Sequence, residues 1–197
     1  NNAVPGPLIE LWEGERAEIA FTNRLAMEST IHWHGLPVPP DQDGSPMDPV
    51  APGATRTYAF DVPMGSAGTY WYHPHAHQTV TLQAGHGLAA PLIVRSLDDP
   101  LQDLSELTLM INGVTLDANG QIVTVGTGMP SMAGMGMSGI SAVLVNGQKS
   151  PVHVLASGAT ERWRLINGTA DRYLRLALDG HRFAVVGTDG GLLGEPL

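Results

Sequence analysis

The stretches IHWHGL, residues 31–36, and TYWYHPH, residues 69–75, each place two histidines two positions apart. Side chains alternate between the faces of a β-strand, so residues i and i+2 point to the same side. Two such strands lying side by side would therefore direct four imidazoles into one space. Imidazole is a good ligand for copper, zinc, iron and nickel, whereas burying its nitrogens without partners would cost free energy. The spacing predicts a metal site formed by His32, His34, His73 and His75.

The sequence around these stretches alternates between apolar and polar residues in short runs. Residues 8–21 predict two strands with a turn at 13–15, and residues 55–62 and 68–73 predict two more. Residues 87–94, GLAAPLIV, form a nearly continuous apolar run, which is typical of a strand buried on both faces. Short strands joined by turns predict an all-β fold, namely a β-sandwich.

The composition narrows the class of protein. Only 15% of the 197 residues are charged, and the 24 Gly and 15 Pro suit a turn-rich β protein better than a helical one. The formal net charge of -9 argues against nucleic acid as a partner, because its phosphates would be repelled. No apolar run reaches the length of a membrane span. The absence of cysteine excludes disulfides, thiolate zinc sites, cysteine nucleophiles and a histidine–cysteine copper centre within this chain.

The pattern changes after residue 96. Residues 107–113 predict one more strand, and Asn119-Gly120 is a hairpin signal. A second strand-rich region starts at residue 141, with alternation in 142–147, 161–167 and 173–191. It faintly repeats the first region without the histidine pairs, which favours a duplicated sandwich with one metal-bearing copy. We expect this second copy to end before it has enough strands to close, so that its apolar face needs a partner.

A methionine-rich stretch separates the two strand-rich regions. Residues 129–139, MPSMAGMGMSG, are small residues and methionines without periodicity, which indicates a mobile loop. Thioethers can bind Cu(I). We nevertheless favour the interpretation that these methionines belong to a flexible linker and do not bind metal; they are Met129, Met132, Met135 and Met137.

Asp43 has two interpretations from chemistry alone. It lies nine residues after His34 and precedes Gly44, so it can be an ordinary Asp-Gly turn. It can also be a carboxylate placed to move protons near the metals.

The remaining histidines and aromatic residues are assigned structural roles. We interpret Trp33, Trp71 and Tyr72 as a packing collar that excludes water from the site. Asn167-Gly168-Thr169 matches a glycosylation acceptor only weakly. The histidines expected not to bind metal are His77, His86, His153 and His181.

A site of paired histidines is compatible with more than one function. A zinc hydrolase can use paired histidines, but it normally adds carboxylate ligands, and neither histidine motif contains Asp or Glu. A non-catalytic copper-binding module is the second alternative. Metal analysis and an absorption spectrum would separate copper from zinc.

The sequence resembles a known family along nearly its whole length. The segments IHWHGLPVPPDQDGSP, 31–46, and AGTYWYHPHAHQT, 67–79, resemble the first two copper motifs of the multicopper oxidases, the laccase-like enzymes. The resemblance implies a cupredoxin-like Greek-key β-sandwich over residues 1–96, a connecting segment over 97–140, and the start of a second, incomplete cupredoxin-like domain over 141–197. It also implies a periplasmic or secreted location.

The resemblance assigns a role to each site residue. His32 would bind the type 2 copper of a three-copper cluster, and His34, His73 and His75 would bind the type 3 pair. Asp43 stands where the family keeps an acidic residue that helps deliver protons. The activity implied is one-electron oxidation of a phenol or metal ion, coupled to four-electron reduction of dioxygen to water.

The sequence also departs from the family pattern. The HxxHxH and HCHxxxH motifs, which supply the other cluster histidines and the type 1 copper site, are not in this chain. We therefore expect this chain to supply half of the cluster ligands and to need the remainder of the enzyme or another chain. The fragment alone is expected to be inactive.

Overall fold

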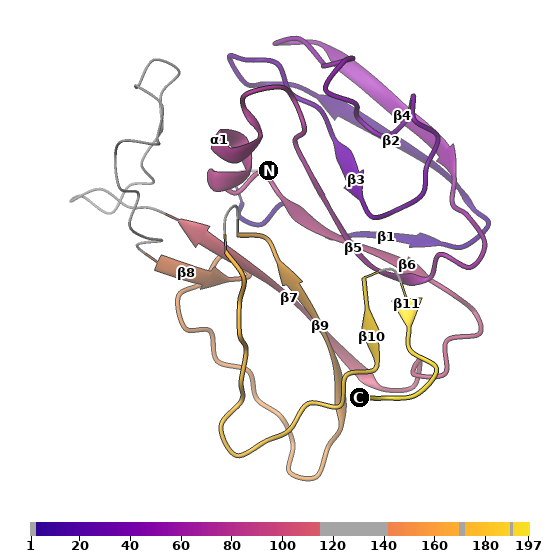
Figure 1. Ribbon diagram of the computed structural model, residues 1–197, viewed down its shortest axis with the longest axis vertical. Coiled ribbons are helices and arrows are strands. Elements are labelled where there is room, and N and C mark those ends of the chain that lie inside the picture. Colours follow the sequence, from indigo (N-terminus) through magenta and orange to yellow (C-terminus); the bar gives the residue numbers. More distant parts are fainter. Residues whose placement is uncertain (1–2, 115–141, 170–171, 190) are drawn as a thin grey trace.

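The computed structural model describes residues 3–114, 142–169, 172–189 and 191–197. Their regular secondary structure is almost entirely β-strand, with one short helix, and no helix among them is long and apolar enough to cross a membrane (Figure 1). In chain order the elements are β1 Ile9–Trp12, β2 Arg16–Thr22, β3 His32–His34, β4 Thr55–Asp61, β5 Gly68–His73, α1 Val80–Gly85, β6 Ala90–Arg95, β7 Ser105–Val114, β8 Ala142–Val145, β9 Glu161–Asn167, β10 Gly187–Thr188 and β11 Gly191–Leu192.

Strands β1 to β6 form a sandwich of two sheets. One sheet has the order β1-β6-β5-β3, with β1 parallel to β6 and the other neighbours antiparallel. The other sheet is the antiparallel pair of β2 and β4. Alternating side chains from both sheets meet in one buried core, formed by Leu11, Ala17, Trp33, Leu36, Tyr58, Phe60, Val62, Tyr70, Leu92 and Val94. The all-β sandwich predicted from the sequence is confirmed.

The strands predicted in this part of the chain are present. β1 and β2 flank the turn at 13–15, and β4 and β5 match the predicted runs. β6 is buried on both faces as expected, but it begins at Ala90 instead of residue 87. The reason is helix α1, which the sequence did not predict. It has six residues and its N-cap Thr79 makes no side-chain capping bond, so it leaves neither a helical period nor a capping signal.

A separate sheet, called the second sheet because it lies outside the sandwich, packs beside the sandwich in the order β8-β7-β9. β7 pairs antiparallel with β8 and parallel with β9. A small core joins this sheet to the sandwich, because Met110 and Ile166 are buried with Ala89, and Trp71 packs against them. The predicted hairpin signal at Asn119-Gly120 and the four methionines of the predicted loop lie outside the described residues.

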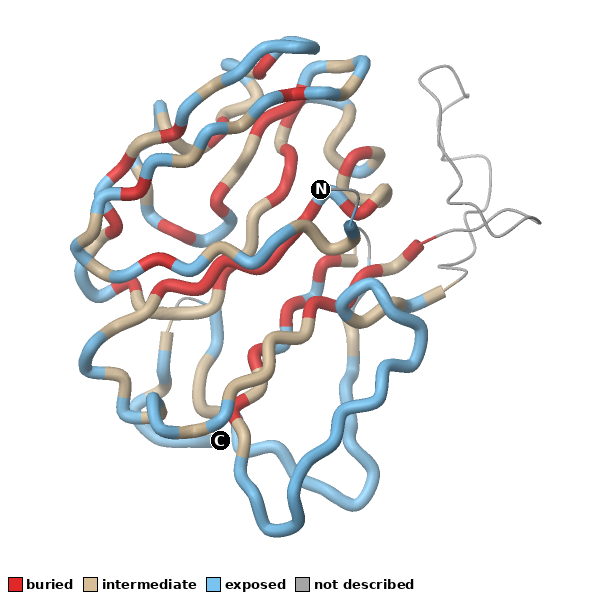
Figure 2. The backbone as a smooth tube through the Cα atoms, turned by 180° about the vertical axis from the view of Figure 1, so that it is seen from behind, coloured by how far each residue is buried: buried red, intermediate tan, exposed pale blue. Residues whose placement is uncertain are grey.

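The predicted alternation over 173–191 gives much less strand than expected. Only the two-residue strands β10 and β11 form there, and no strand is present between residues 172 and 186. Most of residues 172–186 are exposed, as are residues 147–160 (Figure 2). A strand needs a neighbour to satisfy its backbone N–H and C=O groups. Among the described residues no neighbouring strand lies beside this segment, so the alternating sequence does not become a sheet.

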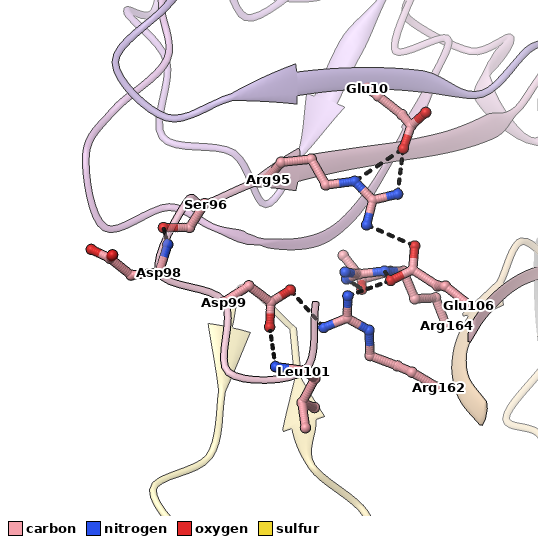
Figure 3. Close-up of polar contacts among 10 residues, drawn as sticks. Glu10, Arg95, Ser96, Asp98, Asp99, Leu101, Glu106, Arg162 and Arg164 are labelled. Atoms are coloured by element: carbon pink, nitrogen blue, oxygen red, sulfur yellow. Dashed lines mark hydrogen bonds and ion pairs between the residues drawn. The ribbon is translucent and has the colours of Figure 1, made fainter. Parts of the chain in front are cut away.

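A network of charged side chains links the sandwich to the second sheet (Figure 3). Glu106 on β7 lies at its centre, with Arg95 Nη1 2.9 Å from Oε1 and Arg162 Nη2 and Arg164 Nε 2.6 and 2.8 Å from Oε2. The outer partners are Glu10, which pairs with Arg95, and Asp99, which accepts a hydrogen bond from Arg162 at 2.7 Å. Arg162 and Arg164 are buried, so their charges depend on these carboxylates.

Candidate metal site

The pairing of β3 with β5 brings the two histidine motifs together. The strands are antiparallel, and His32 lies directly opposite His73, while His34 lies opposite Trp71. Directly opposed residues in an antiparallel pair have their side chains on the same face and close together. The predicted convergence of the histidine motifs on adjacent strands is therefore present in the structure.

The imidazoles of this face form a compact cluster. One nitrogen each from His32, His34 and His73 lie within 4.8 Å of one another. His34 Nδ1 is 3.1 Å from His73 Nε2, which is close enough for a hydrogen bond between the two rings. His75 lies beyond the end of β5, with its ring centroid 5.0 Å from that of His32 and 6.0 Å from that of His73. Three of the four residues predicted as ligands thus form the compact group, and the ring of His75 lies beside it.

Two of the rings are held in a defined orientation by oxygen acceptors. His32 Nδ1 lies 3.1 Å from the carbonyl oxygen of Asp43 and 3.0 Å from its Oδ1. His73 Nδ1 lies 2.8 Å from the carbonyl oxygen of Pro74. A ring that donates its Nδ1–H in this way keeps Nε2 free as a lone-pair donor, the arrangement typical of metal-binding histidines. The sequence indicated neither acceptor.

The surroundings favour the neutral, ligating form of the rings. Burial lowers the pKa of His73 to about 4, with nearby His32, His34 and His75 acting in the same direction against the hydrogen bond to Pro74. Burial first and then His32 lower the pKa of His34. Neutral imidazole is the form that binds metal, so these rings are ready to coordinate a cation at neutral pH.

Asp43 reaches His32 because its loop folds back over β3. Trp33 Nε1 donates to the carbonyl oxygen of Gln42 at 2.9 Å, and Gln42 Oε1 accepts from the backbone N–H of Ala59 at 2.8 Å. Gly44 has φ +64°, and a Cβ there would lie 1.9 Å from the carbonyl oxygen of Ile31. Only glycine permits this close crossing. Asp43 is therefore more than a turn residue, because its oxygens set the orientation of a site histidine.

Two cavities border the histidine cluster. One, of about 290 Å³, is lined by His32, His75, Asp43 and neighbouring residues of its loop. The other, of about 1130 Å³, lies between the sandwich and the second sheet and is bordered by His34 and Trp71. His34 is exposed, so solvent or another protein segment can reach the cluster from the side of the larger cavity.

The predicted aromatic collar is only partly correct. The Trp71 ring packs 4.4 Å from that of His73 and 4.9 Å from that of His34. Trp33 lies on the opposite face of its strand, fully buried against Tyr58 and Phe60 in the sandwich core. Tyr72 also packs against that core, and its hydroxyl donates to the carbonyl oxygen of Pro7. Strand alternation explains the error, because Trp33 and Tyr72 are one residue out of phase with the histidines.

The histidines expected not to bind metal do not belong to the compact group of three found among the described residues. His77 is exposed, and His86 follows the last residue of α1. His153 Nε2 lies 2.8 Å from Glu161 Oε2, and His181 Nδ1 lies 2.9 Å from the carbonyl oxygen of Asp179. Asn167 of the glycosylation pattern donates its side-chain N–H to the carbonyl oxygen of Arg172.

The donor set fits copper. The compact group contains three imidazoles and no carboxylate among the described residues. The Asp43 carboxylate is engaged with a ring nitrogen of His32, and Asp189 also acts electrostatically on His34. All-imidazole sites suit copper and zinc alike, but a hydrolytic zinc site commonly adds a carboxylate and keeps a bound water. The arrangement therefore favours a copper site over a zinc hydrolase.

Comparison with known proteins agrees with this chemistry. Two family models described as multicopper oxidase match residues 1–99 and 68–194. The multicopper oxidase MmcO of Mycobacterium tuberculosis is 34% identical, with 96% of this chain and 42% of that protein covered. The multicopper oxidase mco of Staphylococcus aureus is 30% identical, with 98% and 42% covered. The chain thus spans about two fifths of the length of these relatives.

Solved structures show the same fold. A multicopper oxidase from Campylobacter jejuni, described as a metallo-oxidase, superimposes with a TM-score of 0.87 and 45% identity over 98% of this chain and 40% of that one. A variant of the multicopper oxidase McoA from Aquifex aeolicus has a TM-score of 0.83 and 34% identity over 96% and 43%. These similarities confirm the predicted cupredoxin-like β-sandwich.

Proposed function

The chain belongs to the multicopper oxidase family, and we propose that it supplies half of the histidine ligands of a three-copper cluster that reduces dioxygen to water. In this proposal His32 binds the type 2 copper, and His34, His73 and His75 bind the type 3 pair. The observation that carries the proposal is the convergence of His32, His34 and His73 on one face of β3 and β5, with three nitrogens within 4.8 Å and the His75 ring 5.0 Å from that of His32.

Copper bound here would carry electrons from a reducing substrate, a phenol or a metal ion, to dioxygen. The protein's own contribution is to favour the neutral form of His34 and His73 and to orient the rings of His32 and His73. Burial keeps His73 neutral, and Pro74 fixes its Nδ1–H. Asp43 holds the Nδ1–H of His32 and borders the smaller cavity, so it is placed to exchange protons with water there.

The remaining cluster ligands and the type 1 copper site would come from the rest of the enzyme or from another chain. The exposure of His34 beside the larger cavity leaves that side of the cluster open to them. We propose residues 1–96 as the metal-bearing domain and 141–197 as the start of a second cupredoxin-like domain. The segment 97–140 connects them and also contributes β7 to the sheet of the second domain. We also propose a periplasmic or secreted location.

Oxygen uptake and metal content of the full-length protein test this function. His34→Ala and His73→Ala should each abolish oxygen uptake and lower the bound copper, while circular dichroism shows an intact fold. His153→Ala, far from the cluster, is the matched control and should keep both. Full oxygen uptake by either site variant would refute the ligand assignment.

The same measurements separate the alternatives. Zinc as the bound metal would favour a hydrolase. Bound copper without any oxygen uptake by the unaltered full-length protein would favour the non-catalytic copper-binding module.

A further inference from the structure

His75 is held differently from the other three site histidines. His32, His34 and His73 lie within paired strands, so the sheet fixes their backbone. His75 follows the end of β5 and comes after Pro74, which has no backbone N–H to donate. The backbone N–H of His75 instead donates to the Thr30 side-chain oxygen Oγ1 at 2.8 Å.

Thr30 is well suited to hold this loop in place. Its exposed fraction is 1%, so the hydrogen bond to His75 is shielded from water. The residues on both sides of it are anchored. Ser29 exchanges two backbone hydrogen bonds with Val50, and the backbone N–H of Ile31 donates to the Tyr58 hydroxyl at 3.1 Å. The hydroxyl oxygen of Thr30 is therefore presented from a fixed backbone.

A second set of hydrogen bonds ties down the far end of the same loop. Gln83 on α1 has an exposed fraction of 2%, and its Oε1 accepts from the Ser29 hydroxyl at 2.7 Å. Its Nε2 donates to the carbonyl oxygen of Glu28 at 2.8 Å and to Thr79 Oγ1 at 3.0 Å. The segment 28–30, just before β3, thus holds the loop after β5 both at His75 and at helix α1.

We propose that Thr30 is a positioning residue for His75, and that its hydroxyl, supported by Gln83, sets how tightly the His75 side of the cluster holds copper. The inference deepens the proposed function and rests on it. Without this acceptor, the backbone N–H of His75 has lost its hydrogen bond to Thr30. The backbone from which the imidazole ring projects is then no longer held in place. Removing groups that orient a metal ligand typically weakens metal binding about 10–100-fold.

Variants at position 30 isolate the hydroxyl. Thr30→Val keeps the shape and removes the acceptor, whereas Thr30→Ser keeps the acceptor. In the full-length protein, Thr30→Val should weaken copper binding about 10-fold or more in competition with a copper chelator. Thr30→Ser should restore most of it. If Thr30→Val fails to fold, the difference between Thr30→Ala and Thr30→Ser measures the same hydroxyl.

A metal-free measurement and a control distinguish positioning from general stability. In the copper-free protein, amide exchange of the His75 N–H should be at least 10-fold faster in Thr30→Val than in Thr30→Ser. Ser66→Ala removes another buried hydroxyl, which donates to the carbonyl oxygen of Pro63 at 2.6 Å, outside the site. It should lower the melting temperature and leave copper binding unchanged.

Two results have distinct meanings. Unchanged copper affinity and unchanged His75 exchange in the hydroxyl-lacking variant would overturn the role of Thr30, even if His75→Ala loses copper. Full copper binding by His75→Ala would instead refute the ligand assignment on which the inference rests.

Discussion

Replacing Gly44 by alanine should disrupt both the fold and the site. Gly44 has φ +64°, and a left-handed conformation costs an L-residue about 1–2 kcal/mol. An added Cβ would also lie 1.9 Å from the carbonyl oxygen of Ile31, where ordinary contact begins at 3.4 Å. The loop must move away, which breaks the contacts between Asp43 and His32 and costs a further 1.5–3 kcal/mol, roughly. The total loss is about 3–5 kcal/mol, or roughly 6–20 °C in melting temperature.

Gly53 provides a matched control. It also has a positive φ, +78°, but an added Cβ would meet nothing within 4 Å. Gly53→Ala should therefore lose only the conformational part, about 1–2 kcal/mol. Calorimetry of the copper-free full-length protein measures both melting temperatures, and copper titration measures the site. Equal melting temperatures, or unchanged copper binding in Gly44→Ala, would refute the reasoning.

Three further predictions concern the site and the charged network. Asp43→Ala should leave the fold intact and lower copper affinity about 10–100-fold, because the Nδ1–H of His32 loses its side-chain acceptor; an unaltered copper titration would contradict this. Burial alone would raise the pKa of Glu106, but the neighbouring arginines, Arg164 foremost, hold it below its ordinary value of 4.5. Because the folded pKa is lowered, the stabilisation is complete above pH 4.5 and is lost as pH falls through the folded pKa. Glu106→Gln should therefore make the melting temperature depend less on pH between roughly pH 5 and 3. Thermal unfolding scans at several pH values check this. Stripping copper with a chelator should lower the melting temperature by roughly 5–10 °C if copper had been present at about 100 times its Kd, and His73→Ala should show no such drop.

The metal site was largely predictable because its spacing has a direct geometric meaning. In a strand, histidines two positions apart place both rings on one face, and this holds for His32 and His34 on β3. His75 lies beyond the end of β5, so the rule alone does not place its ring. That the two strands would be neighbours was an inference from chemistry, and the register of His32 opposite His73 confirms it. The same alternation rule, applied to Trp33 and Tyr72, would have placed them in the core.

The supporting contacts were not predictable because they join segments far apart in the sequence. Thr30 and Gln83 carry no local signal, since a hydroxyl and an amide gain their roles only when the loop after β5 returns to the segment before β3. The shortfall of strand over residues 172–186 has a different cause. Alternation shows which residues can form a strand, but a sheet also requires a neighbour.

The central position of Glu106 has a practical consequence for protein engineering. A chimera that grafts residues 1–96 onto another oxidase would leave Arg95 with Glu10 as its remaining partner in this network, and would take away the carboxylate that faces Arg95 at 2.9 Å. The other protein would need an acidic residue at the position equivalent to Glu106, on the first strand after the junction. Choosing recombination partners by that one position should enrich a library for soluble hybrids.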